Sequence, residues 1–276
     1  MTDKNNDLIR KHYQTQANEY GSSSLSTMAE RVVREKEVEL IKKFLEIIRK
    51  KTSRNDLKIL DIGCGNGYTL EVLQKENPSC HFYGLEFTDE LLAIARDRNI
   101  AGCVLESGDI RDTDYPDSFF DAVYTERCLI NILDYEQQKQ SLAEIARILK
   151  PSGYFLMIEC FTDGLENNNK ARREMGLHEI EPAYHNRYFD KEKLFSDIRA
   201  IFEVADLAGS DPDEELQMIE SNFLSSHYFV ARILHPLLTR GDWVRNSEFV
   251  KFFSFLPPIG NYAPIQAFVL KRVMNR

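Results

Sequence analysis

The chain has 276 residues, of which 43% are hydrophobic, so it can bury a substantial core in one or two domains. Its formal net charge of −9 argues against a nucleic-acid partner, because phosphate backbones attract an excess of Lys and Arg. No apolar run is long enough to predict membrane insertion, and the first residues lack the apolar core of a signal peptide. The five cysteines are scattered without a C-x-x-C pair, which suits reduced thiols. We therefore expect a cytoplasmic protein without a metal site.

The first part of the chain is predicted to be helical. Residues 3–20 are expected to form one helix, and residues 26–51 a longer charged helix in which apolar residues recur at helical spacing. We expect residues 1–53 to form a helical cap segment on a single domain that spans residues 1–276.

Beyond residue 53 the pattern changes to an alternation of short apolar strands and helices. The expected strands are 58–62, 81–86, 102–106, 119–125 and 154–160, and the expected helices between them are 69–76, 89–98 and 135–149. Pro151-Ser152-Gly153 is expected to stop the last of these helices and to form a turn. Such alternation predicts an α/β fold with a mostly parallel sheet and helices on both faces.

The alternation is interrupted twice after the fifth strand. Residues 162–189 form a polar stretch that is too long for an ordinary connection, so we expect a lid or binding element there. A helix near 191–202 and a strand near 203–208 follow, and then a second insertion at 211–260. The segment "PIQAFVLKRV" is expected to be the last strand. We expect both insertions to form a cap over one edge of the sheet.

The segment "LKILDIGCGNGYTLEVL" reads as a strand, a glycine turn and a helix. Gly63, Gly65 and Gly67 allow the backbone to turn sharply and to approach a ligand closely. A dinucleotide fingerprint requires G-x-G-x-x-G, but Tyr68 stands where its third glycine would fall. Asp61 at the strand end would repel a pyrophosphate and attract a cationic ammonium or sulfonium group. This charge argument favours S-adenosylmethionine as the ligand and disfavours an NAD-dependent oxidoreductase.

Acidic residues also end the next two predicted strands. Glu86 lies about twenty residues beyond the glycines, where an acidic side chain can bind both ribose hydroxyls. Phe87 beside it is placed to contact the adenine ring. Asp109, in "SGDI", is placed to accept a hydrogen bond from the adenine amino group, while Ile110 packs on the ring. The carboxyl ends of parallel strands meet at one edge of a sheet, so we expect these residues to lie together.

Successive motifs of the chain resemble those of the class I S-adenosylmethionine-dependent methyltransferases. They are "ILDIGCGNG", "GLEFTDELLAIA", "SGDI", "FDAVYTERCLINIL" and "ILKPSGYFLMIE", over roughly residues 55–160. The resemblance implies a Rossmann-like sheet of seven strands whose last strand is antiparallel. It also implies S-adenosylmethionine as the cofactor.

The resemblance further assigns a set of residues to the cofactor. It implies that Asp61 and the glycines hold the methionine end, that Glu86 holds the ribose, and that Asp109 with Ile110 holds the adenine. The stretch "HYQTQANEYG" is similar to segments often found before such domains. By this likeness Tyr13 and Tyr20 would close over the cofactor. Glu126, which ends the fourth predicted strand, is a further candidate for the cofactor site.

The methyl acceptor is less well determined by the sequence. The fourth strand ends in "YTERCLIN", which lacks both the Asn/Asp-Pro-Pro-Tyr/Phe signature of base and glutamine amide methylation and a Pro-Cys nucleophile. A small molecule therefore remains, such as a sugar or another hydroxylated metabolite, with O-methylation favoured over N-methylation. The candidate bases are His185 and His178 in the first insertion, with His185 preferred because of its aromatic and polar setting, "AYHNRYF". The alternative is an inactive sensor or assembly subunit that binds S-adenosylmethionine. The sequence does not indicate an oligomeric state.

Overall fold

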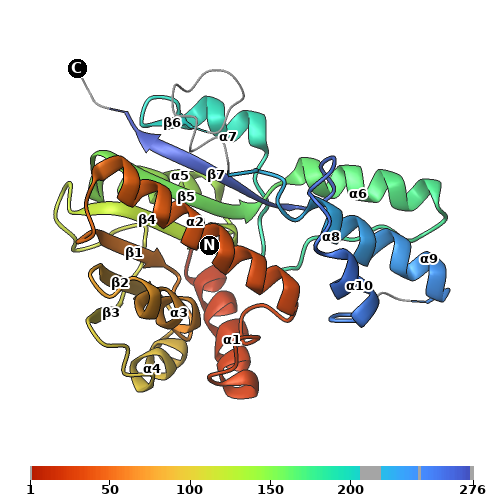
Figure 1. Cartoon of the computed structure of the whole chain (residues 1–276), viewed down its shortest axis with the longest axis horizontal. Helices are drawn as coiled ribbons and strands as arrows, with labels where there is room; N and C mark the ends of the chain where they lie inside the picture. Colours follow the sequence, from red (N-terminus) through yellow and green to blue (C-terminus); the bar gives the residue numbers. More distant parts are fainter. Residues whose placement is uncertain (1, 206–218, 242–243, 274–276) are drawn as a thin grey trace.

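The computed structural model describes residues 2–205, 219–241 and 244–273 of the chain. Its strands form one sheet in the order β3-β2-β1-β4-β5-β7-β6 (Figure 1). They are β1 (Lys58–Ile62), β2 (His81–Glu86), β3 (Cys103–Ser107), β4 (Phe120–Glu126), β5 (Leu149–Cys160), β6 (Phe202–Val204) and β7 (Ile265–Arg272). β7 pairs antiparallel with β5 and β6, and the other neighbours are parallel. The predicted Rossmann-like sheet with an antiparallel last strand is thus confirmed.

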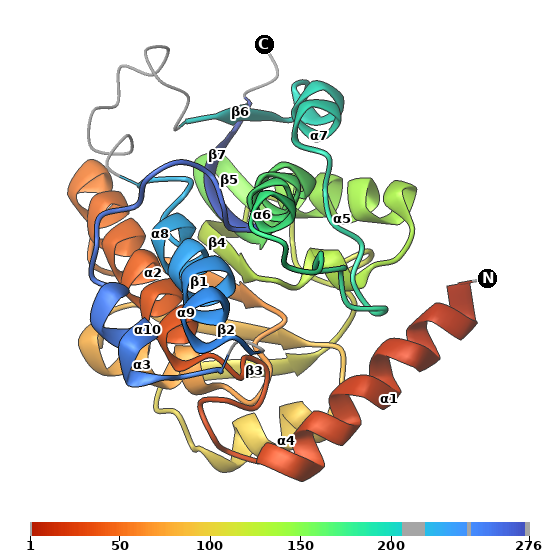
Figure 2. The ribbon, with the colours of Figure 1, turned by 90° about the vertical axis from the view of Figure 1, so that its right-hand side faces the viewer.

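Helices lie on both faces of this sheet. The longer ones are α1 (Thr2–Tyr20), α2 (Arg31–Thr52), α3 (Tyr68–Glu76), α4 (Asp89–Asp97), α5 (Tyr135–Ile148), α6 (Thr162–Glu174) and α7 (Lys191–Ile198). The shorter ones are the 3-10 turn η1 (Leu129–Asn131), α8 (Ser225–Phe229), the π-helical η3 (Val230–Leu234), α9 (His235–Thr239) and α10 (Glu248–Phe253). α2 and α3 cover one face, and α5 covers the other (Figure 2).

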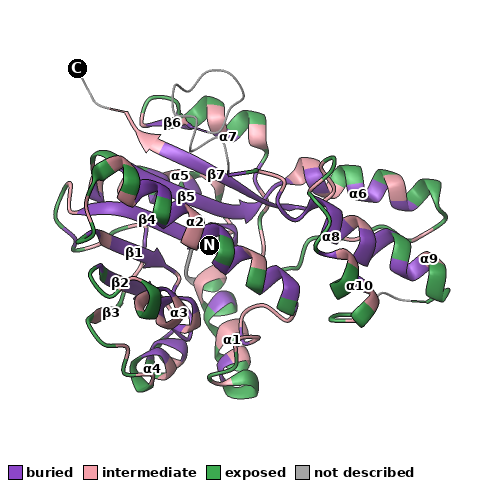
Figure 3. Cartoon of the chain, viewed as in Figure 1, coloured by how far each residue is buried: buried purple, intermediate pink, exposed green. Residues whose placement is uncertain are grey.

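The core follows from the apolar strands. β4 is buried except at its last residue, and β5 is buried from Gly153 to its end, because helices cover both faces there (Figure 3). α2 buries an apolar stripe that includes Ile41, Phe44 and Leu45, each with 0% exposure, and packs on β4 and β5. Of the predicted N-terminal cap, residues 31–52 therefore form a layer of the fold, and α1 is the part that stands away from the sheet.

Local differences from the predicted elements have physical reasons. The turn expected at Pro151-Ser152-Gly153 is a bulge inside β5, where Ser152 has φ 68° and the register with β4 shifts. Half of the polar stretch at 162–189 is the helix α6. The sequence of α6 does not indicate a helix because its polar residues leave no apolar stripe. Within the second expected insertion, residues 211–218 and 242–243 lie outside the described part of the chain, as does the end of the strand expected at 203–208.

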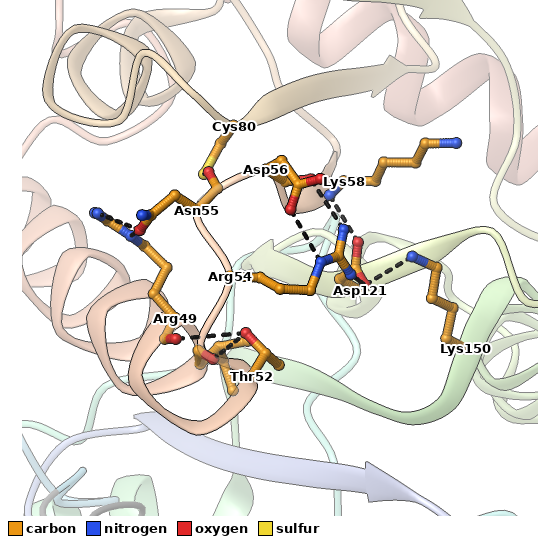
Figure 4. Close-up of polar contacts among 10 residues, drawn as sticks. Arg49, Thr52, Arg54, Asn55, Asp56, Lys58, Cys80, Asp121 and Lys150 are labelled. Carbon is orange, nitrogen blue, oxygen red and sulfur yellow. Dashed lines mark hydrogen bonds and ion pairs between the residues drawn. The ribbon is translucent and has the colours of Figure 1, made fainter.

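The amino ends of the strands carry internal polar contacts, whereas their carboxyl ends are open for a ligand site. At the amino ends of β1 and β4 the carboxylate of Asp121 accepts hydrogen bonds from Arg54 Nη1, Lys150 Nζ and the backbone N–H of Lys58, at 2.8, 2.7 and 2.9 Å (Figure 4). This edge is thus tied together by internal polar contacts. At the carboxyl ends, β1 and β4 are neighbours whose connections leave in opposite directions, which is where open parallel sheets bind ligands.

The carboxyl ends of β4 and β5 face a group of helices that we call the added helices. They are α6, α8, α9 and α10, which stand together beyond this edge (Figure 1). Among the described residues, no helix combines the length and apolar character needed to cross a membrane.

Candidate active site

The glycine turn after β1 forms part of a partly open cavity, which we call the first cavity. Gly63, Gly65 and Gly67 have φ values of 74°, 56° and 75°, in the region that other residues rarely adopt. Gly63 and Gly65 line the cavity. At Gly67 a Cβ would stand 3.0 Å from the Cβ of Ala95 on α4. Gly67 is therefore needed for close helix packing and does not line the cavity wall.

Glu86, at the end of β2, lies on the wall of the first cavity beside this turn. It is 6% exposed, and burial raises the pKa of its carboxyl. Its Oε2 accepts a hydrogen bond from the backbone N–H of Gly65 at 2.9 Å, and its Oε1 accepts one from the N–H of Thr88 at 2.8 Å. A carboxylate has about four lone-pair positions, so about two remain for donors of a ligand in the cavity.

The residues after β2 and β3 also line the first cavity. Phe87, Asp109 and Ile110 all line the first cavity. The guanidinium of Arg10 on α1 lies 4.3 Å from the ring centre of Phe87. Asp109 forms an ion pair with Arg111, which lowers the pKa of the Asp109 carboxyl despite the opposing effect of burial. The wall thus combines a buried apolar side chain with a carboxylate that is held ionised.

Asp61 lies beneath the turn and does not line the cavity. It is 1% exposed and pairs in register with Tyr124 of β4. Burial, with the nearby carboxyl of Glu126, raises the pKa of Asp61 well above its ordinary value. Ile62 and Gly63 form the wall above it. Only Ile62 separates Asp61 from the open turn, and the contact of its carboxylate with the methionine end of the cofactor stays a prediction.

Glu126 does line the first cavity, at the end of β4. Its Oε1 lies 3.1 Å from Nη1 of Arg34 on α2, and both side chains are at most 8% exposed. Burial raises the pKa of the Glu126 carboxyl, whereas Arg34 acts in the opposite direction.

The helix α1 covers the first cavity from outside the sheet. Asn5, Asn6, Ile9 and Tyr13 contribute to the lining. Asn6 Oδ1 accepts a hydrogen bond from Arg111 Nη2 at 3.1 Å, and the Tyr13 hydroxyl accepts one from Asn131 Nδ2 at 2.9 Å. These contacts join α1 to the sheet edge. Tyr20 is 37% exposed on the last turn of α1 and lines neither this cavity nor the second one described next.

A second cavity adjoins the first, and Tyr13, Thr27 and Arg127 line both. Its other polar lining residues come from segments that are distant in sequence. They are His12, Gln16, Glu30, Cys160, His185, Asn186, Tyr188, Tyr228 and Arg245. The loop that follows α6 therefore contributes to this cavity, together with α1 and the added helices.

The two predicted base candidates differ in their surroundings. His185 lines the second cavity, and its Nδ1 is buried without a hydrogen-bond partner among the described residues. Its ring stacks on that of His12, with ring centres 3.8 Å apart. Burial lowers the pKa of both imidazoles, to about 4 for His185, where His12 adds to the effect. His178 is exposed on the loop after α6 and lines neither cavity.

A family model described as a methyltransferase domain matches residues 53–220, which is more than half of the chain. The chain belongs to this family of class I S-adenosylmethionine-dependent methyltransferases. The match covers the glycine turn, the ends of β2 to β5 and the loop of His185.

Known proteins similar to this methyltransferase domain act on different acceptors. A fatty-acid O-methyltransferase of Mycolicibacterium smegmatis is 34% identical over 103 residues, 36% of this chain and 35% of that protein. A demethylmenaquinone methyltransferase of Deinococcus radiodurans is 30% identical over 37% of this chain and 42% of that protein. The chain thus spans less than half the length of each of these two relatives.

A solved structure shows the same fold over nearly all of the chain. The phosphoethanolamine N-methyltransferase 1 of Haemonchus contortus, in complex with phosphoethanolamine and S-adenosylhomocysteine, has a TM-score of 0.59 and 14% identity. The similarity covers 99% of this chain and 50% of that one.

Several site residues of the methyltransferase domain were not identified from sequence. Arg127 lies between the two cavities, with φ 58°, and its guanidinium binds the buried Glu37 of α2 at 2.8 and 3.2 Å. Asn131 positions Tyr13, and His12 stacks on His185. All three lie in segments that carry the family resemblance, but the resemblance assigns no role to them. His12 had a weak signal, since it directly precedes the predicted Tyr13.

Glu159, at the end of β5, positions the turn after β4. It has 0% exposure and accepts hydrogen bonds from the backbone N–H groups of Cys128, Leu129 and Ile130, at 3.0, 2.9 and 3.2 Å. Burial raises the pKa of its carboxyl to about 7. The turn that it holds continues into η1, which carries Asn131. Glu159 thus acts on the site through the backbone.

Proposed function

We propose that this protein transfers the methyl group of S-adenosylmethionine to a hydroxyl group of a small, neutral, polar molecule. The observation that carries the proposal is the pair of adjoining cavities, which share Tyr13, Thr27 and Arg127 as a common wall. One cavity has the residues that suit the cofactor, and the other is lined by His185, whose Nδ1 has no hydrogen-bond partner in the part of the chain that the structure describes.

The residues of the first cavity fit S-adenosylmethionine. Glu86 has about two lone-pair positions left for the two ribose hydroxyls. Asp109 and Ile110 offer an acceptor and an apolar contact for the adenine, and the backbone of Gly63 and Gly65 on the cavity wall is the proposed contact for the methionine end. When bound, the cofactor supplies a methyl group that is activated by its attachment to a sulfonium.

The second cavity suits a neutral acceptor that offers several hydrogen-bonding groups. Two charged side chains of its wall already form ion pairs, Arg127 with Glu37 and Glu30 with Arg232. Amide, hydroxyl and imidazole groups, including those of Gln16 and Asn186, form much of the remaining wall. Such groups match the hydroxyls of a sugar or a similar metabolite. The relatives do not decide this point, because they include both a fatty-acid O-methyltransferase and a demethylmenaquinone methyltransferase.

His185 is the proposed base. Its lowered pKa of about 4 keeps the imidazole neutral at pH 7, and a proton on Nε2 leaves Nδ1 free to accept. As the acceptor oxygen gains a methyl group, its own proton becomes strongly acidic, so even a weakly basic imidazole is able to take it. Alignment of the two reactants accounts for the rest of the rate enhancement.

The test compares His185→Ala with His178→Ala, a matched histidine that lines neither cavity. Methyl transfer is followed with a labelled cofactor on a panel of neutral sugars, other alcohols and amines. We expect His185→Ala to keep its affinity for S-adenosylhomocysteine and to lose turnover by about 10²–10⁴-fold, with His178→Ala like wild type. Full activity of His185→Ala would reject the base. Cofactor binding without transfer to any member of the panel would favour a sensor or assembly subunit.

A further inference from the structure

The added helices carry a cluster of exposed apolar side chains that no part of the proposed reaction uses. Of the twelve large apolar side chains that are exposed in the described chain, seven lie between residues 234 and 259. The most prominent form what we call the apolar tip, with exposures between 47% and 82%. They are Leu238, Val244, Phe252, Phe255, Leu256 and Ile259. A cluster of this kind is unusual on a monomer and marks an interaction surface.

The apolar tip is held in a defined conformation. α10 already uses its inner side, since Phe249, Val250 and Phe253 pack on η3, so Phe252 is left on the outside. α9 and α10 lie side by side at the far end of the molecule (Figures 1 and 2). The segment after α10 is tied to α8, because Ser226 Oγ bonds to Pro257 O and Ile259 N at 2.6 and 3.0 Å. The exposure is thus built into the packing of these helices.

The loop between α9 and α10 is joined to the wall of the second cavity. Asn246 donates to the carbonyl of Ala29 at 2.9 Å and accepts from the backbone N–H of Arg31 at 2.7 Å. Ala29 and Arg245 both line the second cavity. Val244 of the apolar tip directly precedes Arg245, so a surface that covers the tip would lie close to this cavity.

The charge around the apolar tip is opposite to that of the whole chain. Residues 234–260 include three cations, Arg240, Arg245 and Lys251, and two acids, Asp242 and Glu248, so this segment has a net charge of +1, whereas the whole chain carries −9. A surface of anionic lipid headgroups would attract the cations, while the aromatic and aliphatic side chains enter the interface.

We propose that the apolar tip attaches this protein to the surface of membranes that contain anionic lipids. The proposal goes beyond methyl transfer and does not depend on it. The occupant is the headgroup and upper acyl region of a bilayer, in which Phe252, Phe255 and their neighbours are buried superficially.

The test is flotation of the full-length chain with vesicles of phosphatidylcholine, with and without added phosphatidylglycerol. We expect binding to the anionic vesicles that weakens with added salt. Phe252→Ser/Phe255→Ser should lower the partition coefficient by at least about tenfold, as expected when two buried aromatic side chains are lost. Lys251→Glu should lower it by about tenfold, because it replaces an attraction by a repulsion.

The controls change residues of the same kinds outside the apolar tip. Val104→Ser replaces an exposed apolar residue on β3, and Lys193→Glu replaces an exposed lysine on α7. Both variants should bind the vesicles like wild type. Unchanged affinity of all variants for S-adenosylhomocysteine shows that they fold. Equal binding to both kinds of vesicle, binding that the tip variants leave unchanged, or no binding at all would overturn the proposal. A dimer that dissociates in Phe252→Ser, without vesicle binding, would identify the tip as an interface between copies.

Discussion

The conservative variant Glu86→Gln tests the central contact of the cofactor site. The wild-type carboxylate accepts from two backbone N–H groups, those of Gly65 and Thr88, and presents its remaining lone pairs to the first cavity. The amide has nearly the same volume but only one oxygen, and its NH₂ group must face one of the two backbone donors. The perturbation therefore removes one acceptor and one negative charge without creating a cavity.

Two effects are expected from this change, and they are measured separately. A buried donor left without an acceptor costs about 1–3 kcal/mol, so the free energy of unfolding should fall by about that amount. Charge-assisted hydrogen bonds to the ribose hydroxyls are also lost, and we expect the affinity for S-adenosylmethionine to fall at least tenfold, or about 1.4 kcal/mol. Glu86→Ala should weaken binding by at least as much.

Calorimetric titration with S-adenosylmethionine and S-adenosylhomocysteine measures the binding effect, and urea unfolding measures the stability effect. Glu203→Gln, which changes an exposed glutamate on β6, is the control and should alter neither quantity. If Glu86→Gln lost stability but kept its wild-type affinity, Glu86 would only hold the glycine turn. That result would refute the assignment of the ribose to this carboxylate.

Two further predictions concern the turn and a buried carboxyl. Gly65→Val should abolish the binding of S-adenosylhomocysteine measured by calorimetry. The control is Gly176→Val, because Gly176 has a similar φ of 71° but open space around it, and this variant should bind normally. An equal loss of binding in both variants would attribute the effect to backbone strain alone. The pKa of Glu159 is raised to about 7 in the folded state, so its contribution to stability is present below pH 4.5 and is lost as the pH rises to about 7. Glu159→Gln removes this titration, so its free energy of unfolding, measured with urea, should change less between pH 5 and pH 8 than that of the wild type. The same change in both proteins would contradict the prediction.

Much of the fold and the class of cofactor could be predicted from the sequence because their signals are local. The bounds of β1 and β2 matched the predicted ones, since apolar runs bounded by turn residues identify buried strands. Gly63, Gly65, Glu86, Phe87, Asp109 and Ile110 were expected together because strand ends in a parallel sheet converge, and all six line one cavity.

The tertiary structure decided which of these local signals line the cavity. Asp61 belongs to the same motif as Gly63 but is buried in β1 and is not among the lining residues, whereas Glu86 lines the cavity from the end of the next strand. The second cavity has no sequence signature, because its lining comes from α1, the turn after β4, the loop after α6 and the added helices. His12 and His185 illustrate the reason. Neither residue indicates the other in the sequence, and only the packing of α1 against the loop after α6 stacks their rings and shifts their pKa values.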